Sequence, residues 1–255
     1  MEGGGGRTVL KAGNTVRRAA GFWTPRVHQY LAFLSENGFP YAPTPLGIQT
    51  KDEEILTFIP GEVGNYPLSE AIRSENALVS AARLLKRLHD CSVEFAFRNL
   101  DGWMFPAREP LEVVCHGDFA PYNCVFLGDR AVGIIDFDGA HPGPRLWDIA
   151  YAVYRFAPVT SPDNHDGFGG SRDRFRRARL FCDTYDLAVA DRLNLPDMMI
   201  RRLETLVNFM YSEAERGNKH MQKNIDDGHA ILYRRDSEYI AQQSAQMISS
   251  LTSFS

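Results

Sequence analysis

The chain has 255 residues, 44% of them hydrophobic and 24% charged, and its formal net charge is −4. These proportions are those of an ordinary globular protein and exclude a mainly disordered chain, a collagen-like fibre and a coiled-coil rod. A dedicated nucleic-acid binder usually carries a basic excess, so no nucleic-acid partner is expected. No apolar stretch approaches the roughly 20 residues of a membrane span, so no membrane partner is expected either.

Cysteine usage and the N-terminal residues both favour a cytoplasmic protein. The four cysteines form no Cys-x-x-Cys pair. So few cysteines in a chain of this length predict buried structural thiols rather than a disulfide framework. The first residues lack the positively charged and apolar segments of a secretory signal peptide.

The first 60 residues are expected to be rich in strands. Gly13-Asn14 suits a tight hairpin turn between two short strands. A helix follows, with Thr24 as its cap and Pro25 in its first turn, and Gly38 ends it. The predicted strands cover residues 8–11 and 15–18 and two stretches between 41 and 61, of which 55–59 is the clearest.

Beyond residue 61 the pattern becomes mainly helical. Pro60-Gly61 is a candidate hinge, and Ser74 is expected to cap a long helix with an apolar stripe. Further elements are expected as a strand at 111–115, a hairpin from 123–127 and 131–137, a loop at 158–170, and helices at 172–185, 197–216 and 236–251. The prediction is an α+β protein with a small strand-rich lobe, residues 1–60, and a larger, mainly helical lobe, residues 61–255.

Three oxygen-bearing side chains stand at predicted strand–loop junctions. Asp118 follows an apolar strand, Asn123 begins the next strand, and Asp136 ends the second strand of the hairpin. A hairpin brings such positions together on a rigid frame beside an open cleft. Carboxylate and amide oxygens are hard ligands, and Mg²⁺ prefers one or two carboxylates together with substrate phosphates.

The spacing of these three residues is the stronger indication. An Asp followed five residues later by an Asn, and then by a strand-ending Asp, is the arrangement of the kinase catalytic loop. There the first Asp orients the substrate hydroxyl, while the Asn and the second Asp hold Mg²⁺. Gly117 stands where the protein-kinase motif has an Arg.

The motifs resemble those of the aminoglycoside phosphotransferase and choline kinase-like family. The resemblance rests on His-Gly-Asp-Phe-Ala-Pro-Tyr-Asn at 116–123, Ile-Asp-Phe-Asp at 135–138 and Trp-Asp-Ile-Ala at 147–150, with weaker matches at 59–62 and 84–90. It implies a bilobal protein-kinase-like fold whose first lobe binds nucleotide. It also implies transfer of the γ-phosphoryl group of ATP or GTP, with Mg²⁺, to a hydroxyl of a small molecule such as an aminoglycoside or another amino-bearing metabolite.

Carried over residue by residue, the resemblance makes Asp118 the catalytic base. Asn123 and Asp136 become the metal ligands and part of the nucleotide site. Asp138 would either approach a second metal or accept backbone hydrogen bonds. His116 is expected to pack and hydrogen-bond under the loop, and Asp148 resembles the family's structural aspartate.

The N-terminal lobe departs from the family pattern. Only two residues precede the glycine run at 3–6, so the strand that the family has before its glycine-rich turn is missing or very short. The family's phosphate-binding Lys has no clear match, and Arg17 or Arg18 stands about where it should. Only one of the pair can face the nucleotide from a strand. The helical Glu that would pair with the Lys is not evident, and His28 falls near its position.

Two other functions are weighed against the small-molecule kinase. A catalytically weak or inactive kinase-like protein that binds nucleotide or a partner would fit the shortened lobe and the missing Lys–Glu pair. A metal-dependent phosphoesterase built from His116, Asp118 and Asp136 would release phosphate without a nucleotide.

Overall fold

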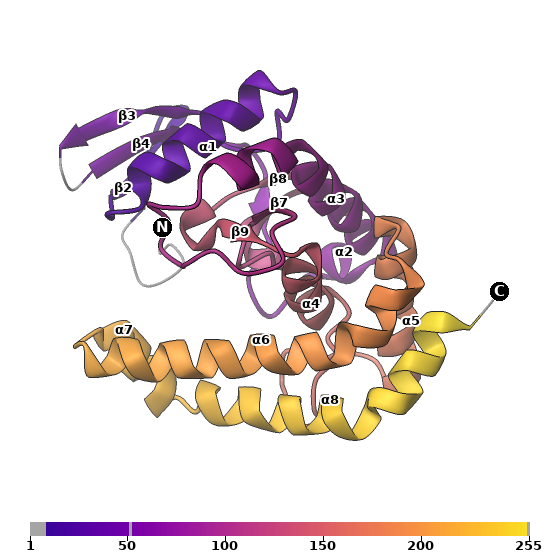
Figure 1. Ribbon diagram of the computed structural model, residues 1–255. Helices are drawn as coiled ribbons and strands as arrows, with labels where there is room; N and C mark the ends of the chain where they lie inside the picture. Colours follow the sequence, from indigo (N-terminus) through magenta and orange to yellow (C-terminus); the bar gives the residue numbers. More distant parts are fainter. Residues whose placement is uncertain (1–8, 51–52, 254–255) are drawn as a thin grey trace. The chain divides into compact units, whose positions relative to one another are not determined.

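The computed structural model describes residues 9–50 and 53–253 (Figure 1). The glycine run and the start of the first predicted strand lie outside these ranges. The chain divides into two compact units, residues 1–148 and 149–255. Strands lie in the first unit and helices alone make up the second, so the predicted α+β character is confirmed for the part of the chain that is described. The predicted boundary between lobes at residue 60 stays a prediction.

The first unit begins with an antiparallel four-stranded sheet and a helix. The strand order is β1-β2-β4-β3, with β1 at Leu10–Ala12, β2 at Thr15–Ala19, β3 at Pro45–Thr50 and β4 at Glu53–Thr57. Helix α1 covers Thr24–Glu36. On neighbouring strands, Arg18 of β2 stands directly opposite Glu54 of β4. Cross-strand partners have Cβ atoms about 5 Å apart, so this register pairs the two opposite charges.

One predicted cap is wrong. Pro25 lies in the first turn of α1, as expected, but the N-cap residue is Trp23 and no side chain caps this helix end. The hydroxyl of Thr24 instead accepts a hydrogen bond from the backbone N–H of Gly21 at 2.9 Å. The Thr24 side chain therefore holds the segment that precedes the helix. It does not accept a hydrogen bond from an unpaired N–H group in the first turn.

The rest of the first unit surrounds one long helix, α3 (Glu75–Arg98). Its predicted cap is confirmed, because the Ser74 hydroxyl accepts from the Ala77 N–H at 3.1 Å. A second sheet has the order β5-β7-β8, and β6 pairs with β9. The remaining bounds are β5 Glu62–Val63, α2 Glu70–Arg73, β6 Val113–Cys115, η2 Pro121–Asn123, β7 Cys124–Leu127, β8 Arg130–Ile134, η3 Phe137–Gly139 and β9 His141–Gly143. The predicted hairpin is thus β7–β8. Its second strand was predicted to reach residue 137, but β8 ends at Ile134, so Asp136 lies in the segment after the strand.

An aromatic cluster ties α1 and α3 to the segment that follows β8. The Tyr30 ring lies 5.3 Å from Phe95, 5.7 Å from Trp103 and 6.0 Å from Phe137, centroid to centroid. All four side chains are buried. Aromatic pairs at these separations contribute about 0.5–1.5 kcal/mol each beyond burial. The cluster anchors Phe137, and with it the backbone of the adjoining Asp136.

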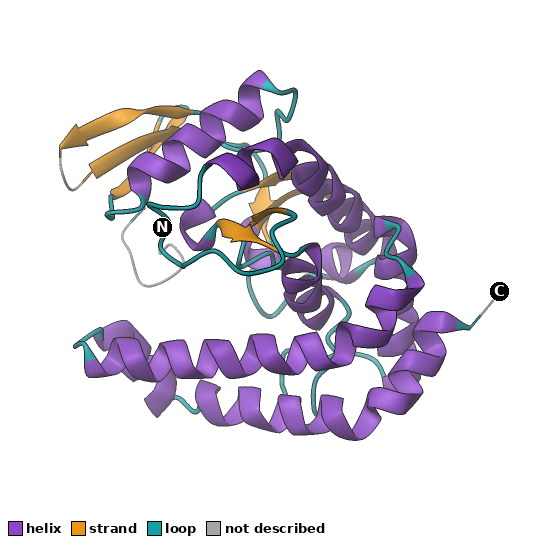
Figure 2. Cartoon of the chain, viewed as in Figure 1, coloured by secondary structure: helices purple, strands orange, loops and turns teal. Residues whose placement is uncertain are grey.

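The second unit is a set of helices (Figure 2). Helix α4 (Arg145–Phe156) enters it and is followed by α5 (Ser171–Tyr185), α6 (Val189–Glu215), α7 (Lys219–Asp226) and α8 (His229–Thr252). Helices α6 and α8 run side by side. The sequence predicted a helix that starts at residue 197, and this prediction is wrong. Helix α6 starts at Val189, and the buried Pro196 lies inside it. No described helix has the length and apolar character that a membrane crossing needs.

Three of the four cysteines are buried, as predicted, whereas Cys91 is partly exposed. Burial raises the pKa of the Cys182 thiol to about 12, and it raises the pKa values of Cys124 and Cys91 as well. These thiols are therefore protonated at neutral pH and poor nucleophiles.

A buried carboxylate organises the loop at 158–170. Asp236 of α8 is fully buried. It accepts hydrogen bonds from the Tyr154 hydroxyl at 2.7 Å, the Ser161 N–H at 2.7 Å and the Asn164 amide at 2.6 Å. These three donors lie in α4 and in the loop, so one side chain connects α8 to both.

Replacing Asp236 by Ala should therefore destabilise the protein by about 3 kcal/mol or more, because three buried donors lose their acceptor. Urea unfolding followed by circular dichroism measures the change. The adjoining Ser237→Ala variant is the control, since its hydroxyl bonds only to the Tyr233 carbonyl of its own helix. Equal stability of the two variants would contradict this role of Asp236.

Candidate active site

Asp118 and Asn123 form a hydrogen-bonded pair in the loop between β6 and β7. The Asn123 amide nitrogen donates to Asp118 Oδ2 at 2.8 Å and to the Asp118 carbonyl at 2.9 Å. The Tyr122 hydroxyl donates to Asp118 Oδ1 at 2.8 Å. The side-chain carbonyl oxygen of Asn123 is the atom that could bind a cation, since an amide nitrogen only donates. Tyr122 was not predicted as a site residue, and the motif spacing alone singles out only the Asp and the Asn.

The loop is held from below by Asp148, at the first turn of α4. Its carboxylate accepts from the His116 N–H at 2.5 Å and the Gly117 N–H at 2.8 Å, and it pairs with His89 Nε2 at 3.1 Å. Gly117 has φ = +80°, and a Cβ there would overlap the carbonyl oxygen of Gly139. This position therefore requires glycine, which accounts for the departure from the Arg of the protein-kinase motif.

His116 joins the two halves of the site. It is buried, its Nδ1 accepts from the Asp118 N–H at 3.2 Å, and its Nε2 lies 3.0 Å from the Ile135 carbonyl, to which it donates. The prediction that this ring hydrogen-bonds beneath the loop is confirmed. Both ring nitrogens are occupied, which disfavours the phosphoesterase that would use His116 as a metal ligand.

Arg18 reaches three carboxylates at once. Its Nε lies 2.7 Å from Glu54, its Nη1 2.6 Å from Asp136 and its Nη2 2.6 Å from Asp138, with 9% of the side chain exposed. Burial by itself lowers the pKa of Arg18, but Asp136, Asp138 and Glu54 together raise it above its usual value. The guanidinium is thus a fixed charge that joins the first sheet to the segment after β8.

Arg17 faces the other way. Its Nη1 lies 3.1 Å from Gln49 and 3.7 Å from Glu53, and 41% of its side chain is exposed. The structure therefore brings Arg18, and not Arg17, next to Asp136. It also adds Glu54, a buried β4 residue that pairs with His28 at 2.7 Å as well as with Arg18. The carboxylate that pairs with Arg18 therefore lies on a strand, whereas the sequence analysis expected it on a helix.

Asp136 is placed by its backbone as well as by Arg18. It has φ = 62° and ψ = 64°, the left-handed region that non-glycine residues rarely adopt. Such a conformation costs about 1–2 kcal/mol and persists only where the surroundings enforce it. The aromatic packing of Phe137 and the ion pair with Arg18 supply that constraint.

The residues fit a hard cation in their chemistry. Asp136 and Asn123 offer carboxylate and amide oxygens, and Mg²⁺ is usually held by one or two carboxylates with waters and phosphates as the other ligands. Among the described residues, no cluster of three or more His, Cys, Asp or Glu side chains is arranged to hold a metal. The protein would therefore supply a partial donor set, which a bound nucleotide would complete.

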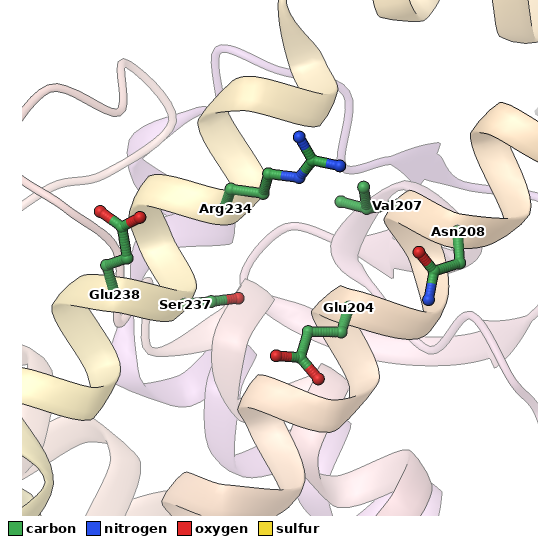
Figure 3. A pocket seen from close by; sticks show the side chains of 6 residues that line it. All are labelled: Glu204, Val207, Asn208, Arg234, Ser237 and Glu238. Carbon is green, nitrogen blue, oxygen red and sulfur yellow. The ribbon is translucent and has the colours of Figure 1, made fainter.

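A separate open pocket of about 400 Å³ lies between α6 and α8 in the second unit (Figure 3). Glu204 and Glu238 bring carboxylates to it from the two helices, and Arg234 brings a cation. The other lining residues are Val207, Asn208 and Ser237. The pocket thus offers both charges to a polar ligand, and the sequence analysis did not identify it.

Comparison with known proteins places the chain in a family. The sequence model of the family described as "Phosphotransferase enzyme family" matches residues 98–181. The trifolitoxin immunity protein of Rhizobium leguminosarum bv. trifolii is 30% identical over 208 residues, and the match covers 78% of each chain.

Two solved structures share the fold. Amicoumacin kinase hAmiN in complex with AMP-PNP, Ca²⁺ and Ami matches with a TM-score of 0.66 and 11% identity, over 92% of this chain and 88% of that one. The gentamicin–APH(2″)-IIa complex matches with a TM-score of 0.55 and 17% identity, over 97% and 92%.

The chain belongs to the phosphotransferase family of aminoglycoside phosphotransferases and choline kinase-like proteins, and it has their protein-kinase-like fold. The predicted family and fold class, with a small strand-rich N-terminal part and a larger helical C-terminal part, are confirmed.

The burial of His89 predicts how stability depends on pH, even though its pairing with Asp148 acts in the opposite direction. Burial lowers the pKa of His89 below its ordinary 6.5. The His89 imidazole therefore stays neutral in the folded chain, whereas in the unfolded chain it takes up a proton as the pH falls. Burial alone raises the pKa of Asp148, but His89, His116 and the Gly117 N–H lower it overall, so its contribution is lost only at more acid pH, below its ordinary value of 3.8.

The free energy of unfolding should thus decrease as pH falls below about 6.5, with a limiting slope of about 1.4 kcal/mol per pH unit from His89. Urea unfolding between pH 8 and pH 5 measures it. His89→Gln is the matched variant and should show a shallower slope over the same interval. Identical slopes in the two proteins would refute the assignment.

Proposed function

We propose that the protein is a Mg²⁺-dependent phosphotransferase that moves the γ-phosphoryl group of ATP or GTP to a hydroxyl of a small molecule. The observation that carries the proposal is the Asp118–Asn123 pair, which is hydrogen-bonded across the spacing of a kinase catalytic loop. Asp136, in the segment that follows β8, adds a second carboxylate on the other side of His116.

In the proposed mechanism, Asp118 orients the acceptor hydroxyl and takes up its proton late in the transfer. Its Oδ1 does so in place of the hydrogen bond that Tyr122 donates. Asn123 holds Oδ2 and leaves its own carbonyl oxygen for the cation. Mg²⁺, when bound by Asn123 and Asp136, would neutralise charge on the β- and γ-phosphates. Catalysis would then consist mainly of positioning and electrostatic stabilisation.

The chemical nature of the acceptor is supported by the solved structures of similar fold. They include a protein in complex with gentamicin and a kinase of amicoumacin. We therefore propose an amino-bearing acceptor, and a cytoplasmic location, where nucleotides are available and free thiols persist.

A second candidate function is a catalytically weak kinase-like binding protein. It is favoured by the ion pair that places Arg18 on Asp136, the proposed metal ligand, at 2.6 Å. The relative at 30% identity is described as an immunity protein, and immunity can arise from binding as well as from chemical modification.

The test replaces Asp118 by Asn. Transfer of labelled γ-phosphate from ATP or GTP is measured against a panel of aminoglycosides, choline and ethanolamine, with and without Mg²⁺. The variant should lose about 10²–10⁴-fold in rate, the usual effect of losing a general base. Its nucleotide-dependent rise in melting temperature should persist, because Asp118 is not assigned to the nucleotide. Asp129→Asn, in the β7–β8 turn, is the control, because the Asp129 carboxylate accepts from the Asn76 amide and no proposed site residue contacts it there.

Each outcome separates the candidates. Transfer that Asp118→Asn abolishes and Asp129→Asn keeps supports the phosphotransferase. Near wild-type turnover of Asp118→Asn would refute the proposed base. A melting-temperature shift with nucleotide but no transfer to any acceptor favours the binding protein, and phosphate release from monoesters without nucleotide would favour the phosphoesterase.

A further inference from the structure

We propose that Arg18 is a resident counter-cation of the Asp136–Asp138 carboxylate pair, and that it sets how weakly this site binds a free divalent cation. The inference rests on the proposed function in one respect, that Asp136 belongs to a nucleotide site. It does not require transfer to an acceptor. It concerns the chain's own residues before any nucleotide is present.

The geometry is that of a cation site already filled by a side chain. The two terminal nitrogens of Arg18 lie 2.6 Å from an oxygen of Asp136 and 2.6 Å from an oxygen of Asp138. One planar guanidinium therefore bridges the two carboxylates and is bound to one oxygen of each. A divalent cation that engaged both carboxylates would have to displace it, because two cations cannot share the same oxygens at these distances.

The side chain is held in this position from behind. Glu54 accepts from the Arg18 Nε at 2.7 Å, and only 1% of the Glu54 side chain is exposed. The other Glu54 oxygen lies 2.7 Å from His28 Nε2. The cross-strand register of β2 and β4 sets the Arg18–Glu54 pair. Arg18 is thus oriented toward the aspartates by a buried partner rather than moving freely in solvent.

The charge count gives the expected direction. Arg18 contributes one positive charge against Glu54, Asp136 and Asp138. Without Arg18, Asp136 and Asp138 would lose the guanidinium that bridges them, and part-buried carboxylates that lose a close positive charge attract cations more strongly. Removing the guanidinium should therefore create a tight divalent-cation site that the natural protein lacks.

The experiment is a Mn²⁺ titration of the full chain without nucleotide, followed by the electron paramagnetic resonance signal of free Mn²⁺. Arg18→Met removes the charge and keeps much of the apolar stem. It should bind Mn²⁺ at least about tenfold more tightly than the natural protein. Arg17→Met is the matched control on the same strand, and it should leave the Mn²⁺ affinity unchanged because Arg17 contacts Gln49 and Glu53 instead.

Adding Asp136→Asn to Arg18→Met should reverse the gain, which would locate the new site at Asp136. Circular dichroism and the melting temperature establish that each variant is folded. If Arg18→Met does not fold, Arg18→Lys replaces it. A single ammonium cannot span three carboxylates, so its Mn²⁺ affinity should still exceed that of the natural protein.

Equal Mn²⁺ affinity in the natural protein and in the folded Arg18 variant would overturn the inference. So would micromolar Mn²⁺ binding by the natural protein itself. Neither result depends on phosphoryl transfer, so the proposed function could stand while this inference fails. Conversely, a protein without any transfer activity could still show the gain of Mn²⁺ binding in Arg18→Met.

Discussion

The candidate site depends on one buried carboxylate. Asp148 has 1% of its surface exposed, and an unpaired charge at such a depth would cost several kcal/mol. Two backbone N–H groups and His89 satisfy it. Because those N–H groups belong to His116 and Gly117, the requirement to satisfy Asp148 determines the path of the backbone immediately before Asp118. Helix α3, the loop after β6 and the start of α4 are joined at this one side chain.

His116 connects the Asp118 loop to the end of the β7–β8 hairpin. Its ring accepts from the Asp118 N–H and donates to the Ile135 carbonyl, so the loop and the end of the hairpin are set relative to each other. Phe137 continues the connection into the aromatic cluster around Tyr30. Asp136 stands between these two anchors, which is why its left-handed backbone can persist.

Much of this arrangement could be predicted from sequence because it is local. The spacing of Asp118 and Asn123, the cap at Ser74 and the β7–β8 hairpin all depend on residues close in the chain. The start of α6 could not be predicted in the same way, since a proline inside a helix is tolerated only where tertiary packing compensates. The Thr24 cap failed because a neighbouring N–H, that of Gly21, competes for the same hydroxyl.

The carboxylate partner of Arg18 could not be predicted from the sequence for a different reason. Glu54 lies 36 residues from Arg18 in the chain, and only the register of β2 against β4 makes them neighbours. A family pattern that expects a helical Glu gives no indication of a strand residue. Likewise, the choice between Arg17 and Arg18 required the face of β2 that meets Asp136, and alternation along a strand states only that the two side chains point apart.

The charge balance at Arg18 also constrains the order in which ligands can arrive. One guanidinium and three carboxylates leave a net negative charge in a site where no more than 21% of any of these side chains is exposed. A triphosphate without a cation would meet that negative charge, and a free divalent cation would meet a guanidinium already bound to the oxygens it needs. Each obstacle is reduced when the two arrive as one complex, since the cation offsets the phosphate charge and the phosphates can pair with Arg18. At the proposed nucleotide site, a resident arginine would therefore favour binding of the nucleotide and its cation together over either one alone.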